Sequence, residues 1–384
     1  MKRRWRKLIS LICLVALLAG CGMADELFSA LHGDGREGFG TRAEETPEAL
    51  FPEDAPETLW GRQQLDAGAR EAYDRLSAAV AARQEEPVQV ETDEDSIRLA
   101  LTALRIDHPE YFWFDGEMSY VTTTYPGYSV TECTMHYTMS ESRVRQAHRQ
   151  VEDFTAGCLA SLEGAGTDYD KILGVYRYII QQTDYVLSES DQSILSVMDG
   201  RRATCAGYAK SFQYMMDRLG IPCVLALGED ASGESHGWNI VKCGGQWYQI
   251  DVTWGDPVDP DGSPGSSLLY TYCMITDQEI YRDHVLVCDL PMPRCSATEY
   301  NYFTMTGRRF DSWDEDAYRD ALASARAAGE QWFSVRFSGR SAYETAREAL
   351  FEQGVIWDAL DQGGDPRVVY SLNDLFYDIS VQLG

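Results

Sequence analysis

The sequence predicts an α+β fold in which helices pack on antiparallel strands. Several segments carry apolar residues at the three- to four-residue spacing of an amphipathic helix. Others are short runs of β-branched and aromatic residues separated by Asp-Gly, Pro-Gly or Gly-Gly, which is typical of strands joined by tight turns. With 384 residues, 44% of them hydrophobic, the chain is long enough for more than one compact unit and can bury a sizeable core.

The first 21 residues predict export. Five basic residues flank the start of an apolar run at residues 8–18, which is too short to span a membrane as a stop-transfer helix and is typical of a signal peptide. The run ends in Leu-Ala-Gly-Cys, which resembles a bacterial lipobox. This resemblance implies that Cys21 is lipidated and anchors the protein to the outer face of the bacterial cell membrane. An ordinary cleaved signal peptide and an uncleaved anchor remain the alternatives.

The charge balance excludes nucleic acid as a partner. The chain has 33 Lys and Arg against 61 Asp and Glu, a formal net charge of −28. Removing the first 21 residues takes away five basic and no acidic residues, and deepens the charge to −33. Such a surface repels phosphates, and no basic stripe compensates for it.

Composition and periodicity divide the rest of the chain into four predicted parts. Residues 22–59 are rich in Gly, Glu, Asp and Pro and predict a flexible tether. Residues 60–162 predict an N-terminal α+β domain, residues 163–295 a catalytic domain and residues 296–384 a C-terminal α+β domain. In the N-terminal domain we expect helices at 65–84, 97–104 and 141–162, and strands at 111–114, 118–124 and 128–138. In the C-terminal domain we expect a helix at 343–353 and strands at 332–337, 368–372 and 376–383.

A cysteine at the start of a helix is the first candidate for chemistry. Residues 169–182 predict one helix, and a second follows Thr204, a residue type that favours the N-cap. Cys205 therefore lies in the first turn, where unpaired backbone N–H groups and the helix dipole stabilise a thiolate. Taken alone, a buried and inert cysteine is the competing interpretation.

A predicted hairpin supplies a histidine and a carboxylate. Two β-rich runs, residues 236–243 and 246–254, are joined by Gly-Gly, which predicts a two-residue turn. In that register His236 faces Thr253 and Asp251 faces Trp238, so His236 and Asp251 are diagonal neighbours on one face of the sheet. With Cys205 they supply a nucleophile, a base and a group that orients the base.

Three boxes then carry a family resemblance. They read TCAGYA at residues 204–209, HGWN at 236–239 and IDVTWGD at 250–256. In that order they resemble the boxes of the bacterial transglutaminase-like superfamily, over roughly residues 165–285. The resemblance implies a papain-like core, with a nucleophile helix packed on an antiparallel sheet and a catalytic triad of Cys205, His236 and Asp251.

The resemblance also implies supporting residues. Trp238, Asn239 and Trp254 match family positions, and we expect them to brace the hairpin. The family generally supplies one oxyanion donor from a side chain, and Gln182, Tyr185 and Gln192 are the candidates. Asp283 and His284 form a second acid–histidine pair, which we expect to be structural because no cysteine box accompanies it. For Arg336, Arg340 and Tyr343 we favour packing or solvated roles over ligand contacts.

No metal or cofactor is expected, because the chain has neither a CxxC nor an HxxxH pair. The chain has ten cysteines. Setting aside Cys13 in the signal, the lipid site Cys21 and the candidate nucleophile Cys205 leaves seven, an odd number that does not indicate a disulfide framework, although Cys288 and Cys295 could pair.

The sequence thus predicts a lipid-anchored cysteine enzyme that acts on amide bonds of a surface or cell-wall peptide or protein, with hydrolysis favoured over cross-linking. The alternative is a catalytically silent binding or scaffolding lipoprotein of the same fold.

Overall fold

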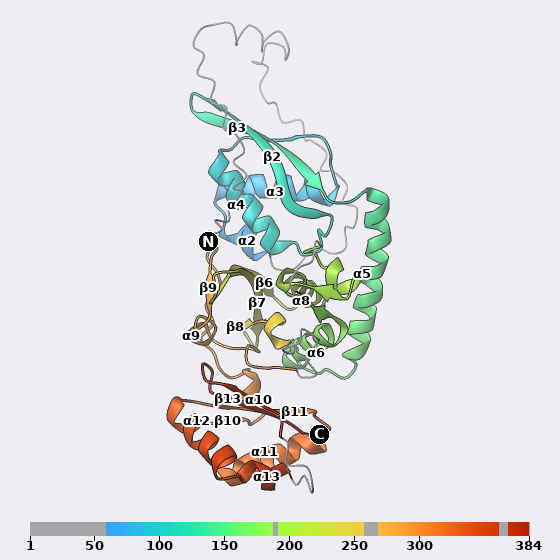
Figure 1. Cartoon of the computed structure of the whole chain (residues 1–384). Helices are drawn as coiled ribbons and strands as arrows, with labels where there is room; N and C mark the ends of the chain where they lie inside the picture. The colour runs from blue at the N-terminus through green and yellow to red at the C-terminus, as the bar shows by residue number, and fades with distance from the viewer. Residues whose placement is uncertain (1–58, 187–190, 257–267, 361–367, 384) are drawn as a thin grey trace, which may run out of the picture. The chain divides into compact units, whose positions relative to one another are not determined.

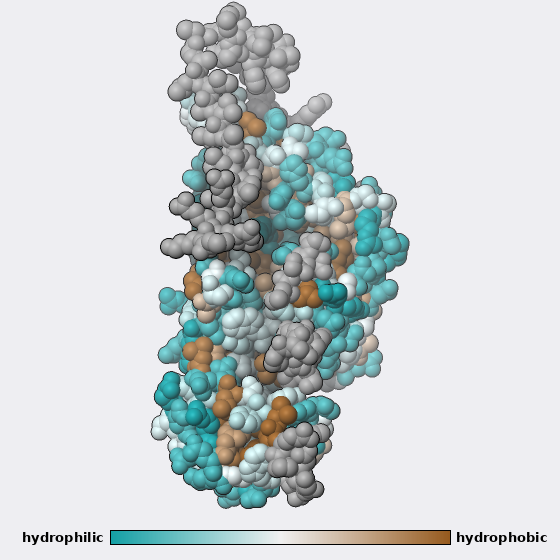
Figure 2. Space-filling model, in the orientation of Figure 1, coloured by the Kyte–Doolittle hydropathy of each residue, from teal (hydrophilic) through white to brown (hydrophobic). Residues whose placement is uncertain are grey.

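The computed structural model describes residues 59–186, 191–256, 268–360 and 368–383. It confirms the α+β prediction, with helices packed on antiparallel and mixed sheets (Figure 1). The predicted signal peptide, Cys21 and the tether up to residue 58 lie outside the described residues. Within the described ranges, no helix has the length and apolar character needed to span a bilayer. The face of the molecule in Figure 2 is mainly hydrophilic, with small separate hydrophobic areas.

The N-terminal part combines helices with a three-stranded sheet. Its elements are α2 (Trp60–Gln64), α3 (Ala67–Ala81), β1 (Val88–Val90), α4 (Glu94–Asp107), β2 (Phe114–Tyr125), β3 (Tyr128–Tyr137) and α5 (Glu141–Ser161). Capping carboxylates define two helix starts, because Asp66 accepts from the N–H of Ala69 and Asp93 from that of Ser96. The strand order is β1-β3-β2, and β2 and β3 form a long hairpin (Figure 1).

The predicted strand at residues 111–114 is wrong. These residues form turns, and the strand begins only at Phe114. Phe112 and Trp113 are buried, and the indole Nε1 of Trp113 donates to the carbonyl of Val80 at 2.9 Å. These aromatic residues favour strands by propensity, but here they are buried, and Trp113 holds this segment against α3.

The middle part contains the sheet and helix that the family resemblance implies. Its elements are α6 (Asp168–Gln182), β4 (Asp184–Tyr185), α7 (Leu195–Met198), β5 (Arg202–Ala203), α8 (Cys205–Arg218), β6 (Cys223–Asp230), β7 (Ser235–Cys243), β8 (Gln246–Ile250), η1 (Thr253–Gly255), α9 (Asp277–Ile280) and β9 (His284–Leu286). An antiparallel sheet of order β8-β7-β6-β9 packs against α8, as Figure 1 shows.

The register of the hairpin was predicted correctly, but the point at which strand pairing ends was not. Cys243 faces Gln246, and pairing continues outward to Asn239 and Ile250. The ladder then stops, so the predicted strand over residues 251–254 is wrong. Oδ1 of Asp251 accepts from the N–H groups of Thr253 and Trp254, a local turn that competes with strand pairing.

One hydrophobic core crosses the predicted boundary at residue 162. It contains Val80 from α3, Ile172 from α6 and Trp238 from β7. A polar contact joins the same parts, because Nε2 of Gln213 in α8 donates to the carbonyl of Ile106 in α4 at 2.7 Å. The N-terminal part therefore packs directly against α8, the helix that begins with Cys205, while the exact domain boundaries remain predictions.

The C-terminal part has a second core and its own sheet, of order β10-β11-β13-β12. Its elements are α10 (Tyr302–Met305), β10 (Arg309–Phe310), α11 (Glu315–Ala327), β11 (Trp332–Phe337), α12 (Arg340–Arg347), the π-helical turn η2 (Glu348–Glu352), α13 (Val355–Leu360), β12 (Tyr370–Asn373) and β13 (Asp378–Gln382). The predicted helix at residues 343–353 is thus a helix that ends in a π turn.

A buried ion pair ties this part to the middle one. The guanidinium of Arg336, only 2% exposed, makes two hydrogen bonds to Asp378, at 2.6 and 2.8 Å. It also donates to the carbonyl of Thr271 at 2.8 Å and lies 3.4 Å from Glu279. Arg336 therefore has a packing role, as expected, and so does Tyr343, which is 1% exposed.

Removing Arg336 should destabilise the fold. The Arg336→Ala variant leaves Asp378 buried without its partner, which costs about 3–5 kcal/mol of unfolding free energy. Urea unfolding followed by circular dichroism measures this loss. Arg340→Ala is the control, because that side chain is 69% exposed, and it should change stability by about 0.5 kcal/mol or less. Equal losses in the two variants would contradict the prediction.

Candidate active site

Cys205 is the first residue of α8, as predicted. It is half-buried and forms no disulfide. Thr204 occupies the N-cap position, as predicted, although its hydroxyl makes no capping bond. The N–H groups of the first turn therefore gain no partner from Thr204. Close packing of α8 requires Gly207, because a Cβ there would overlap Oγ of Ser196 and lie 2.8 Å from Cβ of Ala203.

His236 stands at the start of β7 and contacts Asp251. Its Nε2 lies 2.7 Å from Oδ2 of Asp251. His236 is 8% exposed and Asp251 is fully buried. Because Nε2 is engaged by the carboxylate, Nδ1 is the ring nitrogen left for Cys205, with which His236 shares a hydrogen bond. The geometry thus brings together the three residues predicted from the sequence.

The electrostatics favour a charged pair of thiolate and imidazolium. Burial alone would raise the pKa of Cys205, but the hydrogen bond and charge of His236, together with the Gly237 N–H, outweigh it and lower this pKa. Burial likewise opposes charging of His236, yet the charge and hydrogen bond of Asp251 raise its pKa to about 10. The pKa of Asp251 falls well below its usual range, because the two histidines outweigh its burial.

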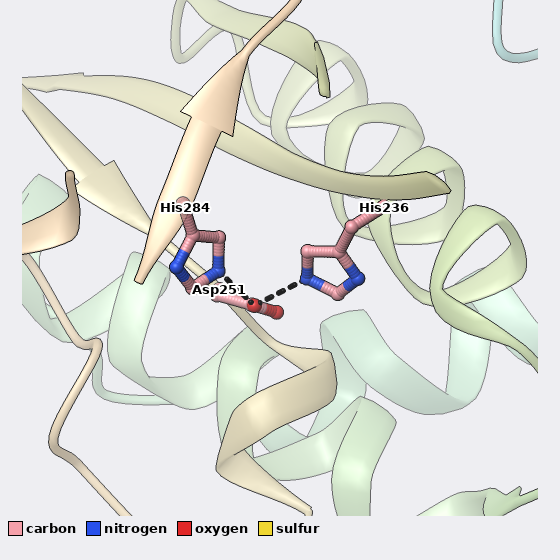
Figure 3. A group of neighbouring side chains, drawn as sticks. All are labelled: His236, Asp251 and His284. Carbon is pink, nitrogen blue, oxygen red and sulfur yellow. Dashed lines mark hydrogen bonds and ion pairs between the residues drawn. The ribbon is translucent and has the colours of Figure 1, made fainter. Parts of the chain in front are cut away.

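His284, expected only as the structural partner of Asp283, also contacts Asp251. Its Nε2 lies 3.2 Å from the same Oδ2 of Asp251, and its Nδ1 lies 2.7 Å from Oδ1 of Asp283. Figure 3 shows Asp251 between the two imidazoles. Position in the fold brings His284 here, because β9 pairs with β6 next to β7. No local spacing signals that pairing, since a long connection separates β8 from β9.

The same three side chains also have the chemistry of metal ligands. Within the described residues, the ligand atoms of His236, Asp251 and His284 lie within 4.8 Å of one another. Two ligands on tetrahedral zinc, each bound at about 2.0–2.1 Å, stand roughly 3.3 Å apart. The 2.7 Å between His236 and Asp251 is shorter and is a hydrogen-bond distance. The arrangement therefore fits shared protons better than a metal ion.

The residues expected to brace the hairpin do contact it. Trp238 is fully buried, and its Nε1 donates to Oε1 of Gln249 at 2.7 Å. Nδ2 of Asn239 donates to the carbonyl of Ala209 at 3.0 Å, which links β7 to α8. The ring of Trp254 lies 5.4 Å from that of His236 and 4.4 Å from that of His284, between centroids.

The three candidate oxyanion donors differ in position. Tyr185 pairs with Ala203, two residues before Cys205, and after burial the charge of Cys205 is the largest influence that raises its pKa. Gln182 is exposed at the end of α6, and Gln192 is exposed in the loop before α7. Tyr185 therefore lies on the strand that pairs with the residues just before Cys205, and its charge interacts with that of Cys205.

Residues 158–252 match the family model of the transglutaminase-like superfamily. The chain carries a transglutaminase-like domain. Cys205, His236 and Asp251 all lie within the matched residues. Cys288 and Cys295, which lie beyond them, form no disulfide.

Two curated relatives match about a third of the chain. Kyphoscoliosis peptidase from Homo sapiens is 27% identical over 142 residues, covering 32% of this chain and 22% of that protein, and the Mus musculus protein gives the same values. The chain thus spans about a fifth of the length of these relatives.

Solved structures resemble the chain more distantly. The crystal structure of a TGase is 15% identical, with a TM-score of 0.27, and the match covers 45% of this chain and 52% of that one. A putative cysteine protease from Cytophaga hutchinsonii is 13% identical, with a TM-score of 0.26, and the match covers 48% and 80%.

Cys205 of the transglutaminase-like domain should react as a thiolate below neutral pH. At pH 6, iodoacetamide should alkylate it at least about tenfold faster than Cys288, because an ordinary thiol with a pKa of about 8.5 is almost fully protonated there. Cys288 is the matched control, since it is also free and half-buried but burial raises its pKa. Peptide mapping by mass spectrometry gives both rates.

The His236→Ala variant tests the cause of this reactivity. Without the imidazole, burial and the Asp251 charge raise the pKa of Cys205 and only the Gly237 N–H opposes them, so its alkylation rate at pH 6 should fall toward that of Cys288. A rate that stays unchanged would show that His236 does not stabilise the thiolate.

Proposed function

We propose that the protein is a cysteine enzyme that cleaves amide bonds through a thioester on Cys205. The observation that carries this proposal is the His236–Asp251 hydrogen bond of 2.7 Å, which holds an imidazole against a cysteine at a helix start. Acyl transfer requires a nucleophile in contact with a base that a third group orients, and Cys205, His236 and Asp251 form such a chain of contacts. The substrate class is a glutamine side-chain amide or a peptide bond.

The proposed reaction proceeds in two steps. The sulfur of Cys205 attacks the amide carbon, and the carbonyl electron pair moves to the oxygen to give a tetrahedral intermediate. Its collapse breaks the C–N bond while His236 donates a proton to the leaving amine, which leaves a thioester. His236 then takes a proton from water, the water oxygen attacks the thioester, and the acid and the free thiol are released.

Two groups are proposed to stabilise the oxyanion. One is the backbone N–H of Cys205 in the first turn of α8, where the helix dipole favours negative charge. The other is the hydroxyl of Tyr185, supported by its electrostatic coupling to Cys205. Gln182 is less suitable, because its amide lies at the exposed end of α6.

We favour water over an amine as the group that resolves the thioester. The matched relatives are named peptidases, and Cys205 is only half-buried. With Cys21 lipidated, the enzyme would act from the outer face of the bacterial membrane on surface or cell-wall peptides. The acidic composition suits an exported protein that must stay soluble.

Cys205→Ala should abolish amide cleavage. Incubation with a glutamine-containing peptide library should trap a thioester on wild-type Cys205, detected by mass spectrometry of the acid-quenched protein. Loss of the nucleophile should lower kcat/KM by about 10³-fold or more, whereas Cys288→Ala should retain full activity. An added primary amine should change the product only slightly if water is the preferred acceptor. A Cys205→Ala variant with the activity of wild type would refute the assignment of Cys205 as the nucleophile.

The same assay separates this proposal from a silent binding protein. A wild-type protein that retains peptides but never forms a thioester would favour the recognition module. An enzyme that transfers most of its acyl groups to the amine would be a cross-linker.

Anchoring should depend on Cys21. In a bacterial host, Cys21→Ala should lose incorporation of labelled palmitate and leave the membrane fraction, because one cysteine carries the lipid. Cys13→Ala is the control, since Cys13 lies inside the apolar run of the signal. Unchanged labelling of Cys21→Ala would refute lipidation at this residue.

A further inference from the structure

The buried Asp251 carboxylate uses both of its oxygens fully. Oδ1 accepts from the N–H groups of Thr253 and Trp254, at 2.8 and 3.1 Å. Oδ2 lies 2.7 Å from Nε2 of His236 and 3.2 Å from Nε2 of His284. An ionised carboxylate offers about four acceptor positions, and all four are filled. Only one of these donors belongs to the proposed triad.

His284 is part of a closed ring of hydrogen bonds. Its Nδ1 contacts Oδ1 of Asp283 at 2.7 Å, and Oδ2 of Asp283 accepts from the hydroxyl of Tyr272 at 2.7 Å. The carbonyl of Tyr272 accepts the N–H of Asp251 at 3.1 Å. The ring therefore returns to the residue that His284 contacts, and it fixes both the backbone and the carboxylate of Asp251.

The ring also constrains where the protons are. Both nitrogens of His284 face carboxylate oxygens, which accept hydrogen bonds when ionised, so both nitrogens carry protons. The neighbours of this imidazolium are Asp251, Asp283, His236 and Tyr272, together with the rings of Trp238 and Trp254. At 1% exposure, His284 has almost no contact with solvent.

We propose that His284 is a positioning residue for the reaction, a second imidazole that holds the Asp251 carboxylate in the orientation that His236 requires. This proposal rests on the function proposed above. Without His284, Oδ2 of the buried carboxylate loses one of its two donors, and its orientation toward His236 is less tightly fixed. The His236 imidazole would then stabilise the Cys205 thiolate less.

Two conservative variants separate the Asp251 contact from the Asp283 contact. The amide nitrogen of glutamine lies near the position of Nε2 in histidine, and that of asparagine near Nδ1. His284→Gln therefore keeps a donor for Asp251, whereas His284→Asn keeps one only for Asp283. Thermal unfolding of both variants reports any general loss of stability.

We expect His284→Asn to lower kcat by about 10- to 100-fold with little change in KM, because misplacement of a catalytic group acts on the chemical step. It should also slow alkylation of Cys205 at pH 6. His284→Gln should recover most of both properties. His108→Gln is the matched control and should leave both unchanged, since His108 is likewise buried between a carboxylate, Glu110, and a tyrosine, Tyr73.

The two readouts keep the two proposals apart. If wild-type protein turns over no amide while the Gln and Asn variants still differ in alkylation, the proposed function fails and the positioning role stands. If wild-type protein is active and His284→Asn matches it in kcat and alkylation, His284 does not position Asp251. Equal losses in the Gln and Asn variants would also overturn the proposal, because they would indicate a merely structural role.

Discussion

The geometry of the site depends on burying one charged carboxylate. Asp251 is fully buried, and a charge in that position is tolerated only when hydrogen bonds and opposite charges compensate for the lost hydration. The compensation comes from the turn after β8, from β7 and from β9. The hydrogen bonds that compensate Asp251 therefore position His236 on β7 and hold β9 and the turn after β8 at the same end of the sheet.

This constraint connects the site to distant parts of the chain. The segment that carries Tyr272 and His284 is also held by Arg336, which binds the carbonyl of Thr271 and the carboxylate of Asp378. On the other side, α8 contacts α4 through Gln213. Both predicted flanking regions thus have a physical role in the middle part, because each contacts an element that carries or orients a proposed site residue.

The local part of the site was predictable from the sequence. Cys205 at a helix start follows from residue pattern, and the pairing of Cys243 with Gln246 follows from the Gly-Gly turn. The strand at residues 332–337 was located to the residue. At residues 111–114 a distant contact of Trp113 with Val80 outweighed strand propensity, and at 251–254 a local turn around Asp251 did so.

The sequence by itself determined the chemistry available to this protein: a cysteine, a histidine and an aspartate in three ordered boxes. Only the tertiary structure decided that Asp251 serves two imidazoles. The reason is physical, since His284 follows a long connection and reaches Asp251 only because β9 pairs with β6 beside β7. Local spacing can encode a hairpin, but a contact made across such a connection depends on how the whole sheet closes.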